Sequence, residues 1–349
     1  MSIFSAQEKA RAQTRKLVLL FALTVLCLVL AVNAGLALMW WPLQRAGIGY
    51  PAYFFTVNTV VTLGFVLGGW WIESSNLSQG GEKLARRVGA RELWESRALE
   101  SGLDNVLQEL LIASRMQAPQ LMVLDREESI NAFAAGWDED DAVIAITRGA
   151  LEQLTREELQ GMMAHELAHI REGDTRLNMR LSGMVFGLEM VFNFGQKLCE
   201  PDDDGNRTGK SIPGAVIMGV GALGWLAGRW LRASVARQRE FLADARALQY
   251  TRSKEGLGGA LRKAQRMALA GSGALRFTHP AVQHMWLLGN TSTTAGNAAS
   301  HADADTQFGT ERPTWSDNHP PIAERIRRIY GRNMPPLPAL EDKVFHFPN

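Results

Sequence analysis

The residues best placed to do chemistry lie near the middle of the chain, where positions 165–169 read His-Glu-Leu-Ala-His. On a helix, His165 and His169 project from one face about one turn apart, so both imidazoles can reach a single zinc ion. Glu166 can then act as a general base toward a metal-bound water. The composition predicts only about 0.01 chance matches to H-E-x-x-H in a chain of this length. We therefore favour a metal site over an amphipathic helix with two surface histidines.

The residues around this motif predict a helix on independent grounds. Thr155 is a suitable N-cap, and Glu158 follows three positions later, as in a capping box. Gly173 is a plausible C-terminal stop. Apolar residues recur between these ends at helical spacing: Leu159, Met162, Met163, Leu167 and Ile170.

A zinc ion held by two histidines needs a further ligand, because catalytic zinc sites usually have three protein ligands and a water. Glu240 and Asp244 are four positions apart and would share a helix face. Glu240 is a candidate third ligand, and Asp244 could accept a hydrogen bond from the far nitrogen of a ligating histidine. The alternative is a solvated, charged helix that includes Arg237 and Arg239. The residues alone leave both interpretations open.

Two short strands are predicted before the motif, at residues 120–124 and 142–147. The stretch from Ile130 to Gly136 lies between them. It is either a strand that ends at Gly136 or an exposed edge strand to which an extended peptide could add. Both interpretations remain open at this stage.

The apolar residues are concentrated in segments that predict membrane spans. Residues 17–41 and 52–72 carry no charge, and about 20 residues suffice to cross a bilayer. A signal peptide is the alternative for the first run, but the run is long and a second follows at once. Basic residues before residue 17 and after residue 72 place both flanks in the cytoplasm. The net charge of +1 gives no electrostatic case for nucleic acid, and the 2 cysteines form no recognisable framework.

A second apolar pair follows the motif, at residues 179–198 and 212–231. We expect four spans in total, although Glu189 must then face protein or water, or this pair does not fully cross. The string Gly219, Gly221 and Gly224 matches G-x-G-x-x-G. Because it lies inside an apolar run, we expect it to serve helix packing and not nucleotide binding.

Four motifs, taken in order, resemble the membrane zinc metallopeptidases of the HtpX and CAAX-prenyl-protease type, and the likeness covers about residues 50–330. They are residues 131–136, residues 165–169 with Gly173-Asp174, residues 239–244 and residues 319–321. The resemblance implies that His165, His169 and Glu240 bind zinc, that Glu166 is the catalytic carboxylate and that Asp244 supports the ligands. It also implies that Asn131, Ala132, Phe133 and Ala134 form the substrate-binding edge strand. His319 would be a second catalytic position, in contact with substrate or the reacting centre. His279-Pro280 ranks lower, because it lacks the following proline and helix.

The expected fold class is α+β, mainly α: an integral membrane protein with a zincin-like peptidase domain, a small sheet and about four transmembrane helices. The expected segments are a transmembrane hairpin at 1–75, a first part of the peptidase domain at 90–178 and a second apolar hairpin at 179–231. A second peptidase part at 232–332 and an irregular tail at 333–349 complete the chain. The loop at 290–314 has no place in the family pattern.

The expected function is zinc-dependent hydrolysis of peptide bonds in misfolded or membrane proteins, with one zinc ion per chain. The resemblance places the protein in the bacterial inner membrane with a cytoplasmic active site. Its partners would be polypeptide substrates and the lipid bilayer. Two alternatives remain: a narrow processing protease of the CAAX type, and a non-catalytic membrane scaffold that holds a structural zinc.

Overall fold

The computed structural model describes residues 3–94, 97–201, 209–270, 285–287 and 319–331, together with residues 335 and 338. The loop expected at 290–314, the pair His279-Pro280 and nearly all of the tail lie outside these residues. The chain forms two compact units. We call Met1–Asn76 with Arg180–Arg232 the helical unit, and Leu77–Met179 with Ala233–Asn349 the sheet unit.

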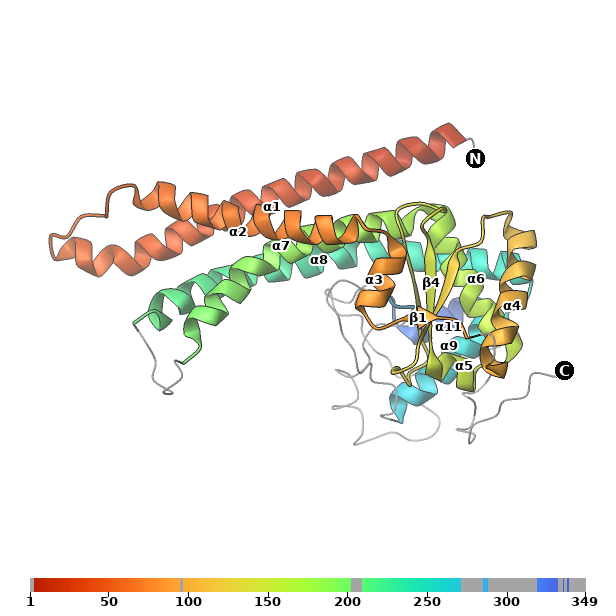
Figure 1. Ribbon diagram of the computed structural model, residues 1–349. Coiled ribbons are helices and arrows are strands. Elements are labelled where there is room, and N and C mark those ends of the chain that lie inside the picture. The colour runs from red at the N-terminus through yellow and green to blue at the C-terminus, as the bar shows by residue number, and fades with distance from the viewer. Residues whose placement is uncertain are drawn as a thin grey trace. The chain divides into compact units, whose positions relative to one another are not determined.

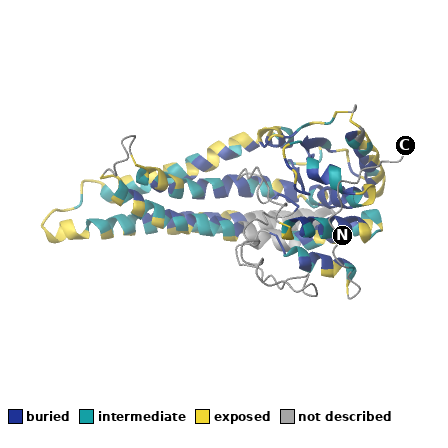
Figure 2. Ribbon diagram, turned by 90° about the horizontal axis from the view of Figure 1, so that it is seen from below, coloured by how far each residue is buried: buried dark blue, intermediate teal, exposed yellow. Residues whose placement is uncertain are grey.

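The helical unit is built from long helices. They are α1 (Ile3–Arg45), α2 (Phe54–Leu77), and parts of α7 (Asp174–Cys199) and α8 (Ser211–Thr251) (Figure 1). One apolar cluster joins all four helices, and its members include Leu28, Val66, Leu188 and Val220. The link between α1 and α2 is exposed, as the yellow segment in Figure 2 shows.

Three helices among the described residues are long and apolar enough to cross a membrane. They are the stretches Leu17–Arg45, Phe54–Leu77 and Ser211–Leu231. Helix α7 has 26 residues, but Arg180, Glu189 and Lys197 interrupt its apolar sequence, and it is not among them. The prediction of membrane helices is therefore confirmed, whereas the predicted count of four is not.

Glycines allow the helices of this unit to approach closely. A Cβ on Gly187 would lie 2.4 Å from the carbonyl oxygen of Val66, and one on Gly221 would lie 2.6 Å from Cα of Phe192. A side chain at either position would thus force α7 away from α2 or α8. The structure confirms the packing interpretation of the glycine string at Gly221.

The sheet unit contains a four-stranded sheet in the order β1-β2-β4-β3. Its strands are β1 (Arg91–Glu92), β2 (Gln120–Leu124), β3 (Ala132–Ala135) and β4 (Val143–Thr147). Strand β4 pairs parallel with β2 and antiparallel with β3. The strands predicted at 120–124 and 142–147 are confirmed, and residues 132–135 form a strand as well. The two-residue β1 was not predicted, because a strand so short carries no periodic signal.

Alternating residues of the sheet contribute to two separate cores. Ile144 and Ile146 pack in one core with residues of α4 (Ala98–Ser114), α6 (Arg156–Glu172) and α9 (Glu255–Leu269). Phe133 and Ala145 pack in the other with residues of α3 (Gly81–Arg87). Helices α5 (Arg148–Gln153) and α11 (Ile322–Tyr330) also belong to this unit, as do the start of α7, up to Met179, and the end of α8, from Ala233 on. Since both faces of the sheet are covered, its strands form a rigid support for α6.

Candidate metal centre

Helix α6 carries the His-Glu-Leu-Ala-His motif and has the ends that the sequence predicts. The Thr155 side chain accepts from the backbone nitrogen of Glu158, and the Glu158 carboxylate accepts from the backbone nitrogen of Thr155 at 2.8 Å. Gly173 ends the helix in the left-handed region, with φ of 71°. The motif lies inside the unit, where His165 and Glu166 are 0% and 1% exposed.

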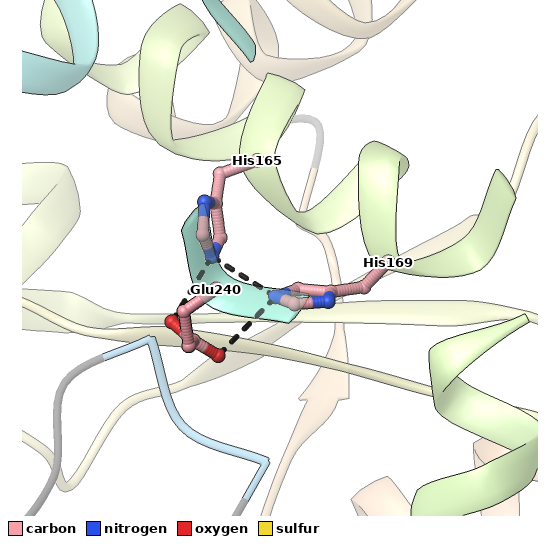
Figure 3. Close-up of side chains that lie close together, drawn as sticks. All are labelled: His165, His169 and Glu240. Atoms are coloured by element: carbon pink, nitrogen blue, oxygen red, sulfur yellow. Dashed lines mark hydrogen bonds and ion pairs between the residues drawn. The ribbon is translucent and has the colours of Figure 1, made fainter. Parts of the chain in front are cut away.

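Three side chains from two distant helices meet beside α6. His165 and His169 come from α6, and Glu240 comes from α8 (Figure 3). Nε2 of His165 lies 3.0 Å from Nε2 of His169 and 3.6 Å from Oε2 of Glu240. Nε2 of His169 lies 3.5 Å from Oε1 of Glu240. These atoms form a triangle that could hold a metal ion.

The size of this triangle fits zinc. Ligand atoms about 2.0–2.1 Å from a tetrahedral zinc ion stand about 3.3 Å from one another, close to the three distances observed. Two histidines and a carboxylate are also a donor set that catalytic zinc sites use. The structure thus brings together all three residues predicted as ligands.

Each histidine has a carboxylate behind it, on the ring nitrogen that faces away from the triangle. Nδ1 of His165 lies 3.0 Å from Oδ1 of Asp244, and Nδ1 of His169 lies 2.9 Å from Oδ2 of Asp174. Such contacts fix the tautomer of a ligating histidine, so that Nε2 presents its lone pair to the metal. The geometry fits the supporting role predicted for Asp244. The matching role of Asp174 was not predicted, because its place directly after the helix stop gives no sign of its direction.

A second unpredicted member of the centre is Arg325 of α11, which is only 1% exposed. Its Nε and Nη2 donate to the two carboxylate oxygens of Asp244, at 2.9 and 2.6 Å. Its Nη1 lies 3.2 Å from Oε2 of Glu240. The sequence held one signal for this role: Arg325 falls on the same helix face as Ile322 and Ile329, where a charge needs a partner.

The charges in the centre keep two of its carboxylates ionised. Burial opposes this, but His319 and Arg325 outweigh burial and hold the pKa of Glu240 well below its usual range. Burial likewise disfavours the charge of Asp244, yet Arg325 and His165 lower its pKa. Ionised oxygens are what both a metal ligand and a histidine-orienting acceptor require.

Glu166 lies in a different environment. Both of its carboxylate oxygens are buried, and neither has a hydrogen-bond partner among the described residues. Burial raises its pKa, and the nearby charge of Glu240 adds to the effect. A buried carboxylate without a partner is costly, and proteins keep such groups mainly where they serve chemistry.

His319 also reaches the centre. It is buried, and its Nδ1 lies 3.5 Å from Oε1 of Glu240. The structure therefore places this residue beside the predicted zinc ligand Glu240.

The predicted substrate strand is less accessible than the sequence suggested. Asn131, Ala132, Phe133 and Ala134 are at most 3% exposed. The backbone nitrogen of Leu287 donates to the carbonyl oxygen of Ala132 at 2.8 Å. Strand β3 does end the four-strand order, and the segment Met285–Leu287 lies against its outer side. Binding of a substrate peptide at this edge stays a prediction.

An H-E-x-x-H helix with a carboxylate ligand from a later helix defines a metallopeptidase type of centre. Residues 97–333 match the family model of Peptidase family M48. The match covers more than half of the chain, and the protein therefore belongs to this peptidase family.

The relatives give a more specific likeness. The chain is 29% identical to a protease HtpX homolog of Ligilactobacillus salivarius over 293 residues, which cover 81% of this chain and 90% of the relative. It is 33% identical to a protease HtpX homolog of Dictyoglomus turgidum over 234 residues, or 65% of this chain and 68% of the relative. No solved structure matches. The predicted resemblance is confirmed: the chain is an HtpX-like membrane protease that acts on polypeptides.

Proposed function

We propose that the protein is a zinc-dependent endopeptidase that hydrolyses unfolded or membrane proteins at the cytoplasmic face of the bacterial inner membrane. The observation that carries this proposal is the position of Glu166. Its carboxylate, which has no hydrogen-bond partner among the described residues, follows directly after His165 in the helix that supplies two of the three candidate metal ligands. A structural zinc site has no need of such a group.

The residues of the centre would have three separate roles: metal binding, proton transfer and substrate contact. His165, His169 and Glu240 would hold the zinc ion, which when bound supplies the Lewis acidity that polarises a peptide carbonyl. Glu166 takes a proton from the attacking water and delivers it to the leaving amine. Its raised pKa suits this task, because the carboxyl must hold the proton between the two steps. His319, whose Nδ1 lies 3.5 Å from Oε1 of Glu240, would contact the substrate at the same centre.

The order of the ligands in the chain supports a matching pair of membrane crossings. His165 and His169 precede α7, whereas Glu240 follows the apolar part of α8, and the three side chains belong to one group. A group with members before and after α7 and α8 requires an even number of crossings between them. Because residues 211–231 can span a bilayer, α7 would cross as well. Basic residues after α2 then favour a cytoplasmic centre.

The test compares wild-type protein with Glu166→Gln, both purified in detergent. Bound zinc is quantified in each, and denatured casein serves as substrate. We expect about one zinc ion per chain in both proteins and cleavage by wild type alone, abolished by a chelator. Zinc binding without any cleavage would favour the narrow processing protease or the scaffold. Absence of zinc from both would contradict the ligand assignment.

A further inference from the structure

A short segment of the same chain lies at the outer edge of β3. Phe133 and Trp286 form an antiparallel bridge, and the backbone nitrogen of Leu287 donates to the carbonyl oxygen of Ala132 at 2.8 Å. The segment Met285–Leu287 therefore lies along the side of β3 that β4 leaves free.

The side chains of this segment fill apolar sites beside β3. Met285, Trp286 and Leu287 are 5%, 1% and 2% exposed. The indole of Trp286 meets the ring of Phe133 edge to face, with ring centroids 5.1 Å apart and an interplanar angle of 79°. A short segment with three apolar side chains, bridged to β3 through Trp286, thus occupies the place that an added peptide would take.

One edge of a strand pairs with one partner at a time, because each outward carbonyl and amide has a fixed direction. We propose that Met285–Leu287 is an internal occupant of the peptide-binding edge, which an extended, apolar substrate segment must displace before it is cleaved. This inference rests on the proposed function. It adds the substrate class: extended segments that place a large apolar side chain opposite Phe133.

Two features of the segment bear on whether it can be displaced. Nε1 of Trp286 is buried without a hydrogen-bond partner among the described residues, so the seated position leaves a polar group unsatisfied. Arg325 donates from Nη1 to the carbonyl oxygen of Leu287 at 2.8 Å, while its other donors bind Asp244. The residue that supports the metal centre therefore also holds the occupant in place.

A reversible disulfide tests whether the segment must move. The bridge between Phe133 and Trp286, continued by one residue in each chain direction, brings Ala134 opposite Met285, and facing residues of antiparallel segments have Cα atoms within the range of a disulfide. The variant is Ala134→Cys with Met285→Cys, in a chain whose Cys27 and Cys199 are replaced by serine. We expect the oxidised protein to cleave denatured casein more than about tenfold more slowly than the same protein after reduction with a phosphine.

The controls separate this inference from the proposed function. The two single-cysteine variants, oxidised and reduced in the same way, show whether oxidation alone changes the rate. If wild type cleaves casein and the locked and reduced forms cleave equally fast, Met285–Leu287 is a permanent strand and the inference is overturned. If wild type does not cleave any unfolded substrate, the proposed function fails and the inference fails with it.

A substitution at Trp286 distinguishes the two interpretations, because only a displaceable segment predicts faster cleavage. Trp286→Ala weakens the seated segment, so we expect casein cleavage to accelerate about threefold or more. A permanent strand predicts a loss of activity or no change. The disulfide remains decisive if this variant does not fold.

Two competitor peptides test the substrate class. Both contain an extended apolar segment, and they differ only in a central Trp or Glu. We expect the Trp peptide to inhibit casein cleavage about tenfold more strongly than the Glu peptide, because its indole can occupy the site beside Phe133. Equal inhibition would contradict the apolar match.

Discussion

Arg325 donates hydrogen bonds to both carboxylate oxygens of Asp244, at 2.9 and 2.6 Å, although 81 positions separate the two residues in the chain. Asp244 in turn lies 3.0 Å from Nδ1 of His165. The arginine therefore sets the orientation of the first predicted zinc ligand through one intervening carboxylate.

We expect Arg325→Met to lower zinc affinity about 10- to 100-fold, because Asp244 and Glu240 would lose the cation that aligns them. Arg325→Lys should recover only part of the affinity, since an ammonium group cannot bind both oxygens in a fixed fork. Competition with a zinc-sensitive chelator measures the effect. Arg328→Met is the matched control, because Arg328 lies on the same helix with its side chain 56% exposed. Equal affinity in Arg325→Met and wild type would show that Arg325 has no part in the metal centre.

We expect Asp174 to orient the imidazole of His169, as Asp244 orients that of His165. Asp174→Asn replaces the carboxyl group 2.9 Å from Nδ1 of His169 by an amide, and we expect zinc affinity to fall about 10-fold or more. The measurement is zinc content after dialysis against graded chelator. Asp104→Asn, at an exposed position of α4, is the control. If both variants retain zinc equally, the contact does not orient the ligand.

Gly161 fixes how closely α6 and α9 pack. A Cβ at this position would lie 2.1 Å from the backbone nitrogen of Leu257, so Gly161→Ala must push the helices apart. We expect it to lower the free energy of unfolding by about 1–3 kcal/mol. Thermal unfolding in detergent, followed by tryptophan fluorescence, gives the comparison with Gly49→Ala, whose Cβ would meet no atom within 4 Å. An unchanged midpoint for Gly161→Ala would show that the helices can separate freely.

The ion pairs around Arg91 predict a loss of stability in acid. Arg91 lies 2.6 Å from Glu100 and binds Asp125 as well. Hydrogen bonds from Arg91 lower the pKa of Asp125. Burial opposes the charge of Glu100, but the Arg91 bond and the Trp94 amide outweigh it, so its pKa is lowered too.

Because these pKa values are lower in the folded than in the unfolded state, their contribution to stability is present above the ordinary values of 3.8 and 4.5. It is lost as the pH falls through the lowered values. Arg91→Met should destabilise the protein by about 3 kcal/mol at pH 7 and flatten the decline below pH 4. Unfolding midpoints across pH 3–7 test this. If the unfolding midpoint of Arg91→Met declines as steeply in acid as that of wild type, other carboxylates cause the loss of stability.

The proposed crossing of both α7 and α8 predicts the side of the membrane on which the α7–α8 connection lies. A single cysteine at Gly209, in a chain without Cys27 and Cys199, should react with a membrane-impermeant maleimide added to intact bacterial cells. A single cysteine at Lys254 should react only after the cells are opened. If Gly209→Cys is also protected until then, neither α7 nor α8 crosses the membrane.

The local sequence by itself determined the helix that carries the centre. Thr155, Glu158 and Gly173 set its ends, and the four-residue spacing of His165 and His169 set their common face. These features depend on backbone hydrogen bonds within a few residues, and they hold whatever the rest of the chain does. The membrane helices at 17–41 and 52–72 could also be predicted from local sequence, because length and composition suffice to identify such a helix.

Only the tertiary structure decided which distant groups complete the centre. The sequence around Asp174 does not predict its contact with His169, and the sequence around Arg325 does not predict its contact with Asp244. Such contacts depend on how separate helices pack. The state of the β3 edge was hidden likewise: pairing of Ala132 with Leu287 joins residues over 150 positions apart. Short-range patterns thus identified the chemistry, and long-range packing determined its support and its access.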